Sequence, residues 1–395
     1  MKHLLTATAA AALLAAPALA QDDTVKIGIL LGFTGPIESM TQGMATGAEF
    51  AIQEINDSGN FPLGTVEPVR ADSTCIDAAA ATAAAERLIT SDGVAAIIGA
   101  ACSGVTGAVL QNVARPNGIV MISPSATSPA LSDAEDDGLF FRTAPSDARQ
   151  GEVIAEVLAE RGVNEIALTY TNNDYGKGLA DSIQSAFEAQ GGTVTISAAH
   201  EDGKADYSAE IGALASAGGD ILVVAGYADQ GGQGIVRAAL DAGAFDTFQL
   251  PDGMVSDSLT DTFGSEIDGS YGQIGGSDSE GGVTFAEMAD EAGFDATGAY
   301  TAESYDAAAL MLLAMAAAGS TESAEFKDKI TEVANAPGEP IQPGELGRAL
   351  EILAEGGDID YVGATAIELV GNGESAGNFR EVEVRNGEFE TIGYR

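Results

Sequence analysis

The hydrophobic residues of this chain fall into two alternating patterns. Short unbroken apolar runs at residues 25–31, 94–98 and 119–122 are typical of strands buried on both faces of a parallel sheet. Between such runs, apolar residues recur every three or four positions, for example after Pro36, which predicts a helix that Gly59 ends. The repeated order of strand and helix predicts a doubly wound parallel α/β sheet.

The same alternation restarts in the middle of the chain, which predicts a second sheet of the same kind. Helices are expected at 147–161, 178–189, 207–217 and 230–242, and strands at 165–170, 193–198, 221–225 and 248–250. After residue 269 the chain is glycine-rich and then helical, at 283–292, 298–318, 322–335 and 343–355, so we expect these helices to return and cover the first sheet. The last strands, 363–370 and 379–384 with an Asn386-Gly387 turn, are expected to complete the second sheet.

These patterns predict two α/β lobes, each a doubly wound parallel sheet, joined by three crossing segments that form a hinge. The expected first lobe is 21–143 plus 277–361, and the expected second lobe is 144–276 plus 362–395. In parallel sheets of this kind ligands bind beyond the carboxyl ends of the strands, so a binding cleft between the lobes is expected.

The first twenty residues have the pattern of a secretory signal. A charged start, an apolar segment at 4–16 and Ala18-Leu19-Ala20 before Gln21 indicate a cleaved signal peptide at 1–20 and export to the periplasm. The apolar segment is too short to span a membrane.

The charge and the cysteine content limit the classes of function that this chain could have. With 60 acidic and 17 basic residues, the formal net charge of -43 argues against binding to nucleic acid or to anionic lipid. The two cysteines, Cys75 and Cys102, fit one disulfide in an oxidising compartment. The sequence has no cluster of metal ligands and no phosphate-binding glycine motif, so we expect the protein to bind neither a metal nor another cofactor.

One motif resembles a catalytic one. Gly373-Glu374-Ser375-Ala376-Gly377 matches the G-x-S-x-G nucleophile elbow, but its flanks predict a strand pair and no histidine follows Ser375, so we interpret it as a loop connection. The histidine beyond the signal, His200, lies at a predicted exposed strand end, which favours a solvated side chain over a catalytic base. An enzyme is therefore not expected.

Polar and aromatic residues follow several predicted strands. Hydroxyls and free backbone N–H groups on the first lobe suit a carboxylate, and a carboxylate on the second lobe suits an ammonium group, so together they suit a zwitterion. Ordinary roles as turn, helix-cap or packing residues remain an alternative for each position. The candidates are Cys102, Ser103, Ser125, Ala126 and Thr127 in the first lobe, and Tyr175, Tyr227 and Asp252 in the second.

Several longer motifs surround these candidates. They include Gly35-Pro36-Ile37, Ala101-Cys102-Ser103, Ser123-Pro124-Ser125-Ala126-Thr127, Tyr175-Gly176-Lys177, Gly226-Tyr227 and Pro251-Asp252-Gly253. With these motifs the mature chain resembles the leucine/isoleucine/valine-binding protein family, the periplasmic receptors of branched-chain amino acid ABC transporters. The resemblance implies a type I periplasmic binding fold, a monomer that traps an amino acid and delivers it to a permease in the inner membrane.

The resemblance also implies roles for individual residues. It implies a Cys75–Cys102 disulfide, a ligand carboxylate on Ser103 and Thr127, and a ligand ammonium at the Ser125 carbonyl and Asp252. It places Tyr227 nearby and Tyr175 on the cleft wall. Two departures affect pocket size: Met40 stands where founding members carry an aromatic residue, and Asp252 is one methylene shorter than their glutamate.

Two other functions stay open at this point. A ligand-sensing receptor of the same fold for an amide or another small carboxylate would share the cleft, although the signal peptide and the lack of a fused output domain favour transport. An exported hydrolase would need a histidine base, which the sequence does not place near a nucleophile.

Overall fold

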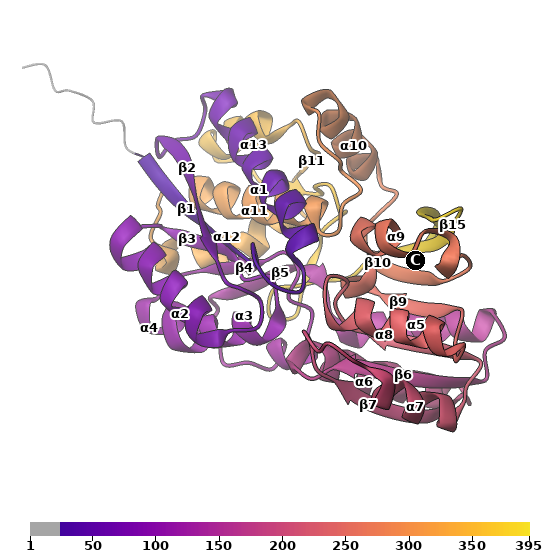
Figure 1. The fold of residues 1–395 in the computed structure, drawn as a ribbon. Coiled ribbons are helices and arrows are strands. Elements are labelled where there is room, and N and C mark those ends of the chain that lie inside the picture. Colours follow the sequence, from indigo (N-terminus) through magenta and orange to yellow (C-terminus); the bar gives the residue numbers. More distant parts are fainter. Residues whose placement is uncertain (1–23) are drawn as a thin grey trace, which may run out of the picture.

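The computed structural model describes residues 24–395, so the predicted signal peptide at 1–20 lies outside the described residues. The described chain forms two seven-stranded sheets, each covered by helices, and one two-stranded sheet. Figure 1 shows the two lobes side by side, the first in indigo and purple with orange helices from late in the chain, the second in magenta and red. The predicted class of two parallel-rich α/β lobes is confirmed.

The first sheet is parallel except at one edge, where β13 and β14 pair antiparallel. Its strands, in spatial order, are β13 (Leu369–Val370), β14 (Glu374–Ser375), β5 (Phe140–Pro145), β4 (Met121–Ser123), β3 (Ala96–Gly99), β1 (Thr24–Leu31) and β2 (Thr65–Asp72).

The second sheet is parallel in its centre and ends in an antiparallel hairpin. Its strands, in spatial order, are β16 (Glu388–Tyr394), β15 (Phe379–Arg385), β10 (Tyr271–Gly275), β9 (Phe248–Pro251), β8 (Ile221–Ala225), β6 (Glu165–Thr171) and β7 (Thr193–His200). The small third sheet pairs β11 (Glu339–Ile341) with β12 (Ile359–Tyr361).

Helices pack on both sheets as the apolar periodicity predicts. Those of the first lobe are α1 (Glu38–Ser58), α2 (Ala78–Arg87), α3 (Ser103–Val109), α4 (Arg115–Asn117), α11 (Thr301–Ala318), α12 (Ser323–Ala334) and α13 (Leu346–Ala354), with the π-helical turns η1 (Leu88–Asp92) and η2 (Leu110–Ala114) and the 3₁₀ turn η3 (Pro129–Leu131). Those of the second lobe are α5 (Asp147–Glu160), α6 (Asp174–Ala189), α7 (Ser208–Ala217), α8 (Gly231–Ala242) and α9 (Asp257–Phe263), with the 3₁₀ turns η4 (Asp252–Met254) and η5 (Gly264–Ile267). Helix α10 (Glu280–Ala292) follows the second crossing.

The late helices return to the first lobe, as expected. Helix α11 packs against α1 and against strands β3, β4 and β5, and it is buried along nearly its whole length. Within the described residues no single helix is long and apolar enough to span a membrane. Helices α11 and α12 meet these criteria of length and composition only when they are taken together, and the chain bends by 115° between them.

The predicted strand at 363–370 in the second lobe is wrong. Residues 363–366 form a turn in which Gly363 and Ala366 have positive φ, and of the predicted strand only β13 is extended. The buried carboxylate of Asp306 holds this turn, because it accepts hydrogen bonds from the Ala364 N–H at 2.8 Å and the Thr365 N–H at 2.9 Å. Strands β13 and β14 join the first sheet, so the third crossing lies between β14 and β15 and not near residue 361.

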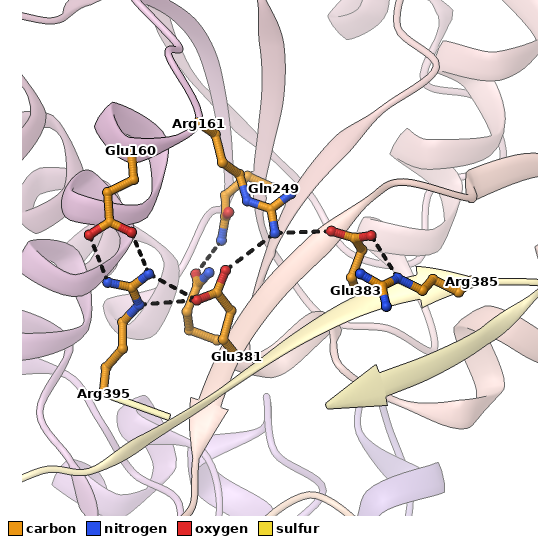
Figure 2. A network of polar contacts seen from close by, with 8 residues as sticks. Glu160, Arg161, Gln249, Glu381, Glu383, Arg385 and Arg395 are labelled. Atoms are coloured by element: carbon orange, nitrogen blue, oxygen red, sulfur yellow. Dashed lines mark hydrogen bonds and ion pairs between the residues drawn. The ribbon is translucent and has the colours of Figure 1, made fainter. Parts of the chain in front are cut away.

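The C-terminal hairpin is attached to helix α5 by ion pairs (Figure 2). Arg395 contacts Glu160 at 2.6 Å and Glu381 at 3.1 Å, while Arg161 contacts Glu381 at 3.3 Å and Glu383 at 3.0 Å. This network fixes β15 and β16 on the second sheet, and the chain therefore ends in the second lobe.

Candidate functional site

The first wall of the interlobe cleft begins where β3 ends. Cys102 stands directly before helix α3 and forms a disulfide with Cys75, with a Cα–Cα distance of 5.1 Å. The expected disulfide is therefore confirmed. The hydroxyl oxygen of Ser103, the first residue of α3, accepts a hydrogen bond from the Ser128 N–H at 3.1 Å. The disulfide and this contact together hold the Ser103 side chain beside the loop that follows β4.

Residues 125–127, which follow β4, differ in the hydrogen-bond partners of their polar groups. The Ser125 hydroxyl donates to the Ala101 carbonyl at 2.9 Å, and the Ala126 N–H donates to the Ser123 hydroxyl at 2.9 Å. The Thr127 hydroxyl is buried and has no hydrogen-bond partner within residues 24–395. Of the side chains in this loop, Thr127 is thus the one that most needs a partner from outside.

A wholly buried guanidinium lies beneath the same loop. Arg142, in β5, donates from Nη1 to the carbonyl oxygens of Ala126 at 3.2 Å and Ser128 at 3.0 Å. Because these two carbonyls flank Thr127, Arg142 fixes the backbone on both sides of it. Sequence reasoning did not single out Arg142, although a charged residue in the apolar run Phe140-Phe141 is a detectable signal.

The second wall of the cleft carries Asp252, at the start of η4. Its Oδ1 accepts hydrogen bonds from the Tyr175 hydroxyl at 2.6 Å and from the Gly253 N–H at 2.8 Å, and its Oδ2 accepts one from the Tyr300 hydroxyl. Burial raises the pKa of Asp252, and the hydrogen bonds from Tyr175, Tyr300 and Gly253 oppose that rise without cancelling it. Tyr300 belongs to the first lobe, so this contact crosses the cleft.

Gly253 is needed for the close packing around Asp252. A Cβ atom at this position would lie 2.6 Å from the Gly226 carbonyl oxygen and 2.8 Å from the Tyr175 hydroxyl oxygen. Any side chain at position 253 would therefore push Tyr175 away from Asp252.

The two predicted tyrosines of the second lobe lie together. The rings of Tyr175 and Tyr227 stack at 5.0 Å between centroids with 17° between their planes. Burial raises the pKa of both hydroxyls well above its usual value. Tyr227 lines a cavity of about 420 Å³ whose other walls come from both lobes, including Cys75 and Gly104 of the first lobe and Asn173 of the second.

A second interlobe cavity, of about 550 Å³, opens on another side of the lobe interface. It is lined by α1 residues including Met40, by Val255 to Ser258 before and within α9, and by Ala299 next to Tyr300. Met40 thus lies at the lobe interface, beside the cleft, as the family resemblance implies.

A carboxylate that sequence reasoning missed stands between the two walls. Asp147 is the first residue of α5; its N–H donates to the Thr127 carbonyl at 2.8 Å, and its side chain is wholly buried. Burial is the main reason why the pKa of the hydroxyls of Tyr175, Tyr227 and Tyr300 is raised, and the charges of Asp252 and Asp147 add to that rise. Ser146 caps this helix, because its side chain accepts a hydrogen bond from the Ala148 N–H, so Asp147 is not needed for capping.

The structure therefore brings the predicted residues to one region. Ser103 and Thr127 lie on the first wall, Asp252 and the stacked tyrosines on the second, and Asp147 contacts the first wall while its charge acts on Asp252. Cys102 contributes its disulfide, and Ala126 contributes its backbone N–H, which donates to the Ser123 hydroxyl. The Ser125 hydroxyl donates to the Ala101 carbonyl within the first lobe.

The lobes also touch at the rim of the cleft. The Ser39 N–H of α1 donates to Oδ2 of Asp229 at 2.8 Å, the hydroxyls of Ser39 and Ser256 lie 2.9 Å apart, and the Ser128 hydroxyl donates to the Asp174 carbonyl at 3.1 Å. These contacts describe a closed arrangement of the two lobes.

The prediction for His200 is wrong. The imidazole is buried, and its Nδ1 lies 2.9 Å from the Thr169 hydroxyl. Burial lowers the pKa of His200 to about 4, so the ring is neutral at physiological pH. It packs behind Gly226 and Gly231 in the second lobe, where it has a structural role. Ser375 lies in β14, and β15 is the next element, so no helix follows the serine as the nucleophile elbow requires.

The sequence of this chain is similar to those of known proteins. Residues 24–349 match the family described as periplasmic binding protein. A Leu/Ile/Val-binding protein homolog 1 of Brucella melitensis is 32% identical over 337 residues, which cover 84% of this chain and 88% of that protein. A leucine-, isoleucine-, valine-, threonine- and alanine-binding protein of Pseudomonas aeruginosa is 31% identical over 248 residues, but the match covers only 65% of that protein and 62% of this chain.

Solved structures share the fold. A leucine binding protein of Thermotoga maritima has a TM-score of 0.78 at 22% identity, covering 94% of this chain and 98% of that one. A branched-chain amino acid transporter substrate binding protein of Streptococcus pneumoniae in complex with isoleucine has a TM-score of 0.76 at 22% identity, covering 93% and 99%. A solute binding protein of R. palustris in complex with benzoate has a TM-score of 0.75 at 19% identity, covering 94% and 96%.

Proposed function

Because this chain belongs to the periplasmic binding protein family and to its leucine/isoleucine/valine-binding members, we propose that it is the solute-binding protein of an ABC transporter that captures an amino acid in the interlobe cleft. Relatives named for binding branched-chain amino acids support this proposal. In the proposed role the loaded protein delivers the amino acid to a permease in the inner membrane.

One observation carries the proposal: a buried carboxylate on one wall of the cleft lies opposite a wall of hydroxyl groups. Asp252 is 2% exposed and Thr127 is 3% exposed, so both would be removed from water together with a ligand. A buried charge is stabilised only when it has a partner of opposite charge and further hydrogen bonds. An amino acid supplies an ammonium for Asp252 and a carboxylate for the hydroxyls.

We assign the contacts as follows. The α-carboxylate accepts hydrogen bonds from the hydroxyls of Ser103 and Thr127, and the ammonium lies against Asp252 and the Ser125 carbonyl. The remaining proposed contacts form the walls of the pocket: Cys102, Ala126, Tyr175 and Tyr227. The stacked tyrosines offer a flat apolar surface to the ligand.

We further propose that the protein works as a monomer in the periplasm. The sequence pattern of residues 1–20 supports export, and the disulfide between Cys75 and Cys102 is stable in that oxidising compartment. The two lobes of one chain supply both walls of the cleft, so capture needs no second copy.

Titration calorimetry with the twenty common L-amino acids on the chain from Gln21 tests the proposal. We expect tight binding of at least one of them with one site per chain and no chemical change of the ligand. Asp252→Ala should weaken that binding by about 3 kcal/mol, because the ammonium loses its charged partner. Asp241→Ala, which removes an exposed carboxylate from the same lobe, is the matched control and should bind normally.

Two outcomes would overturn the proposal. Failure of every amino acid to bind would exclude this ligand class, and near-normal affinity of Asp252→Ala would mean that the ligand is not held as a zwitterion. Conversion of the ligand to a product would point to an enzyme.

A further inference from the structure

The carboxylate of Asp147 is buried in the cleft without the hydrogen bonds that a buried acid normally makes. Its side chain is 0% exposed, and neither carboxylate oxygen makes a hydrogen bond of good geometry within residues 24–395, although the Thr127 hydroxyl lies close enough to lower the pKa of Asp147. The Thr127 hydroxyl beside it is also buried and without a partner in the same part of the chain. Buried polar groups are almost always hydrogen-bonded, so two unsatisfied neighbours at one place require an explanation.

Other buried acids of this protein show how different Asp147 is. Asp306 accepts hydrogen bonds from the Tyr361 hydroxyl, from the Ala364 N–H, and from both the N–H and the hydroxyl of Thr365. Asp252 accepts three hydrogen bonds from groups of the protein, as described above. Within the described residues the protein thus provides several donors for each of these two carboxylates, whereas the Thr127 hydroxyl is the one donor that acts on Asp147.

The charges around Asp147 do not balance. Burial and the charge of Asp252 raise the pKa of Asp147 well above its usual value, while the Thr127 hydroxyl and the Arg142 guanidinium act in the opposite direction. Both terminal nitrogens of Arg142 are already hydrogen-bonded elsewhere, to Ala126, Ser128, Ser132 and Glu374. Among the described residues neither Asp147 nor Asp252 forms an ion pair, and Arg142, the cation that acts on Asp147, directs both terminal nitrogens to other groups.

We propose that Asp147 is a second acid for the ligand, so that an amino acid's ammonium group is held between Asp147 and Asp252. This inference rests on the proposed function and makes its ligand class narrower. A primary ammonium has three N–H donors and no acceptor. Asp147, Asp252 and the Ser125 carbonyl are three acceptors of the right kind, and the two acids reach the ammonium from different segments of the chain.

With Asp147 and Asp252 both facing the ligand, only a ligand that carries an ammonium group should bind tightly. A 2-hydroxy acid, a 2-oxo acid or an aromatic acid carries the carboxylate but no positive charge, so it would leave both acids without a positive partner and add another carboxylate to the cleft. A mismatch of this kind discriminates strongly between ligands, because the buried groups of the site remain unpaired. The same fold binds benzoate in one of the solved structures, so the fold itself does not impose this requirement.

The test compares Asp147→Asn and Asp147→Ser with wild type. The probes are the amino acid that wild type binds most tightly among the twenty common ones and the 2-hydroxy acid with the same side chain. We expect each substitution to weaken amino acid binding at least tenfold and to leave binding of the 2-hydroxy acid unchanged or stronger. Wild type should prefer the amino acid by at least a hundredfold, and this preference should fall at least tenfold in both variants.

Thermal unfolding without ligand separates a ligand-binding acid from a structural one. Because Asp147 has at most the Thr127 hydroxyl as a donor and is repelled by Asp252, Asp147→Asn should leave the melting temperature unchanged or raise it. Asp306→Asn, the matched control, removes the charge of a fully hydrogen-bonded buried acid and should lower the melting temperature without changing the preference for the amine.

Proton release gives an independent measurement. In the ligand-free cleft Asp147 faces Asp252, Arg142 and the hydroxyls of Tyr175, Tyr227 and Tyr300, and it holds a proton at a higher pH than a free aspartate does. At any pH at which Asp147 still carries that proton, an arriving ammonium should displace it. Calorimetry in buffers of different ionisation enthalpy should detect this release in wild type, and it should be smaller in Asp147→Asn.

The outcomes distinguish the two proposals. If wild type binds an amino acid and Asp147→Asn binds it equally well, the role of Asp147 is refuted and the proposed function stands. If wild type binds no amino acid, both fail. A lower melting temperature of Asp147→Asn combined with an unchanged preference for the amine would make Asp147 a structural residue and would also overturn the inference.

Discussion

Arg142 in β5 donates a hydrogen bond from Nη2 to Oε1 of Glu374 in β14 at 2.8 Å. Arg142 is wholly buried, whereas the Glu374 side chain is 24% exposed, so the pair is partly shielded from water. The contact joins the strands that precede the first and the third crossings between the lobes. The glutamate belongs to the motif that resembles a nucleophile elbow, and its role here is to hold a buried guanidinium.

Replacing the buried cation should be costly. Arg142→Met should lower the free energy of unfolding by about 3–5 kcal/mol, because Glu374 loses its partner and the carbonyls of Ala126 and Ser128 lose their donor. Ligand affinity should fall as well, since these carbonyls flank Thr127. Urea unfolding and calorimetry measure both. Glu374→Gln is the control: it keeps an acceptor for Arg142 and should retain normal affinity with a loss of about 1 kcal/mol.

The disulfide should contribute to stability mainly through the unfolded chain. Cys75 and Cys102 are 27 residues apart, and closing a loop of that size is worth about 3 kcal/mol in the chain-entropy account. The double variant Cys75→Ser, Cys102→Ser should lose about that amount in urea unfolding. A reducing agent should destabilise wild type and leave the double variant unchanged; equal effects on both proteins would contradict this explanation.

The phenol that reaches Asp252 across the cleft should matter for binding as well as for stability. Tyr300→Phe removes a donor from a buried carboxylate and should cost about 1–2 kcal/mol of stability. Since the same contact links the two lobes, ligand affinity should fall severalfold. Tyr361→Phe removes an equivalent phenol from Asp306, outside the cleft, and should cost stability at normal affinity.

The rim contact between Ser39 and Asp229 should favour the closed arrangement of the lobes. Asp229→Ala removes the acceptor of the Ser39 N–H, and at this partly exposed position we expect an affinity loss of about 1 kcal/mol. Asp229→Asn retains a carbonyl oxygen that can accept the same hydrogen bond and should bind almost normally. Small-angle scattering with ligand should show a larger radius of gyration for the alanine variant; identical curves would refute this role.

Stability should fall at higher pH because of Glu303 near the hinge. Burial, with a smaller contribution from Asp306, raises the pKa of Glu303 to about 7 from the ordinary 4.5. A raised folded-state pKa stabilises the fold at low pH, and this contribution is lost as the pH rises from about 4.5 through 7. The shift corresponds to about 3 kcal/mol. The unfolding free energy of wild type relative to Glu303→Gln should therefore drop by about this amount between pH 4.5 and pH 8.

The architecture, and the meeting of most of the proposed binding residues at the cleft, could be predicted from the sequence. Unbroken apolar runs and helical spacing are local properties, and they located both parallel sheets. Because the carboxyl ends of parallel strands meet at one edge of a sheet, Ser103 and Thr127 could be expected together, and so could Tyr175 and Asp252. These predictions depend on short segments whose geometry their own residues determine.

Other features depended on segments far apart in the chain. The strand predicted at 363–370 is a turn because Asp306 binds its backbone N–H groups, and His200 is buried because Thr169 and the packing of α8 enclose it. Asp147 has the sequence signature of a helix start, and only the approach of the two lobes places it beside Thr127 and near Asp252. Periodicity tells which face of a strand or helix is apolar, but whether a particular polar group is buried, and with which partner, is decided by residues that meet only in the folded protein.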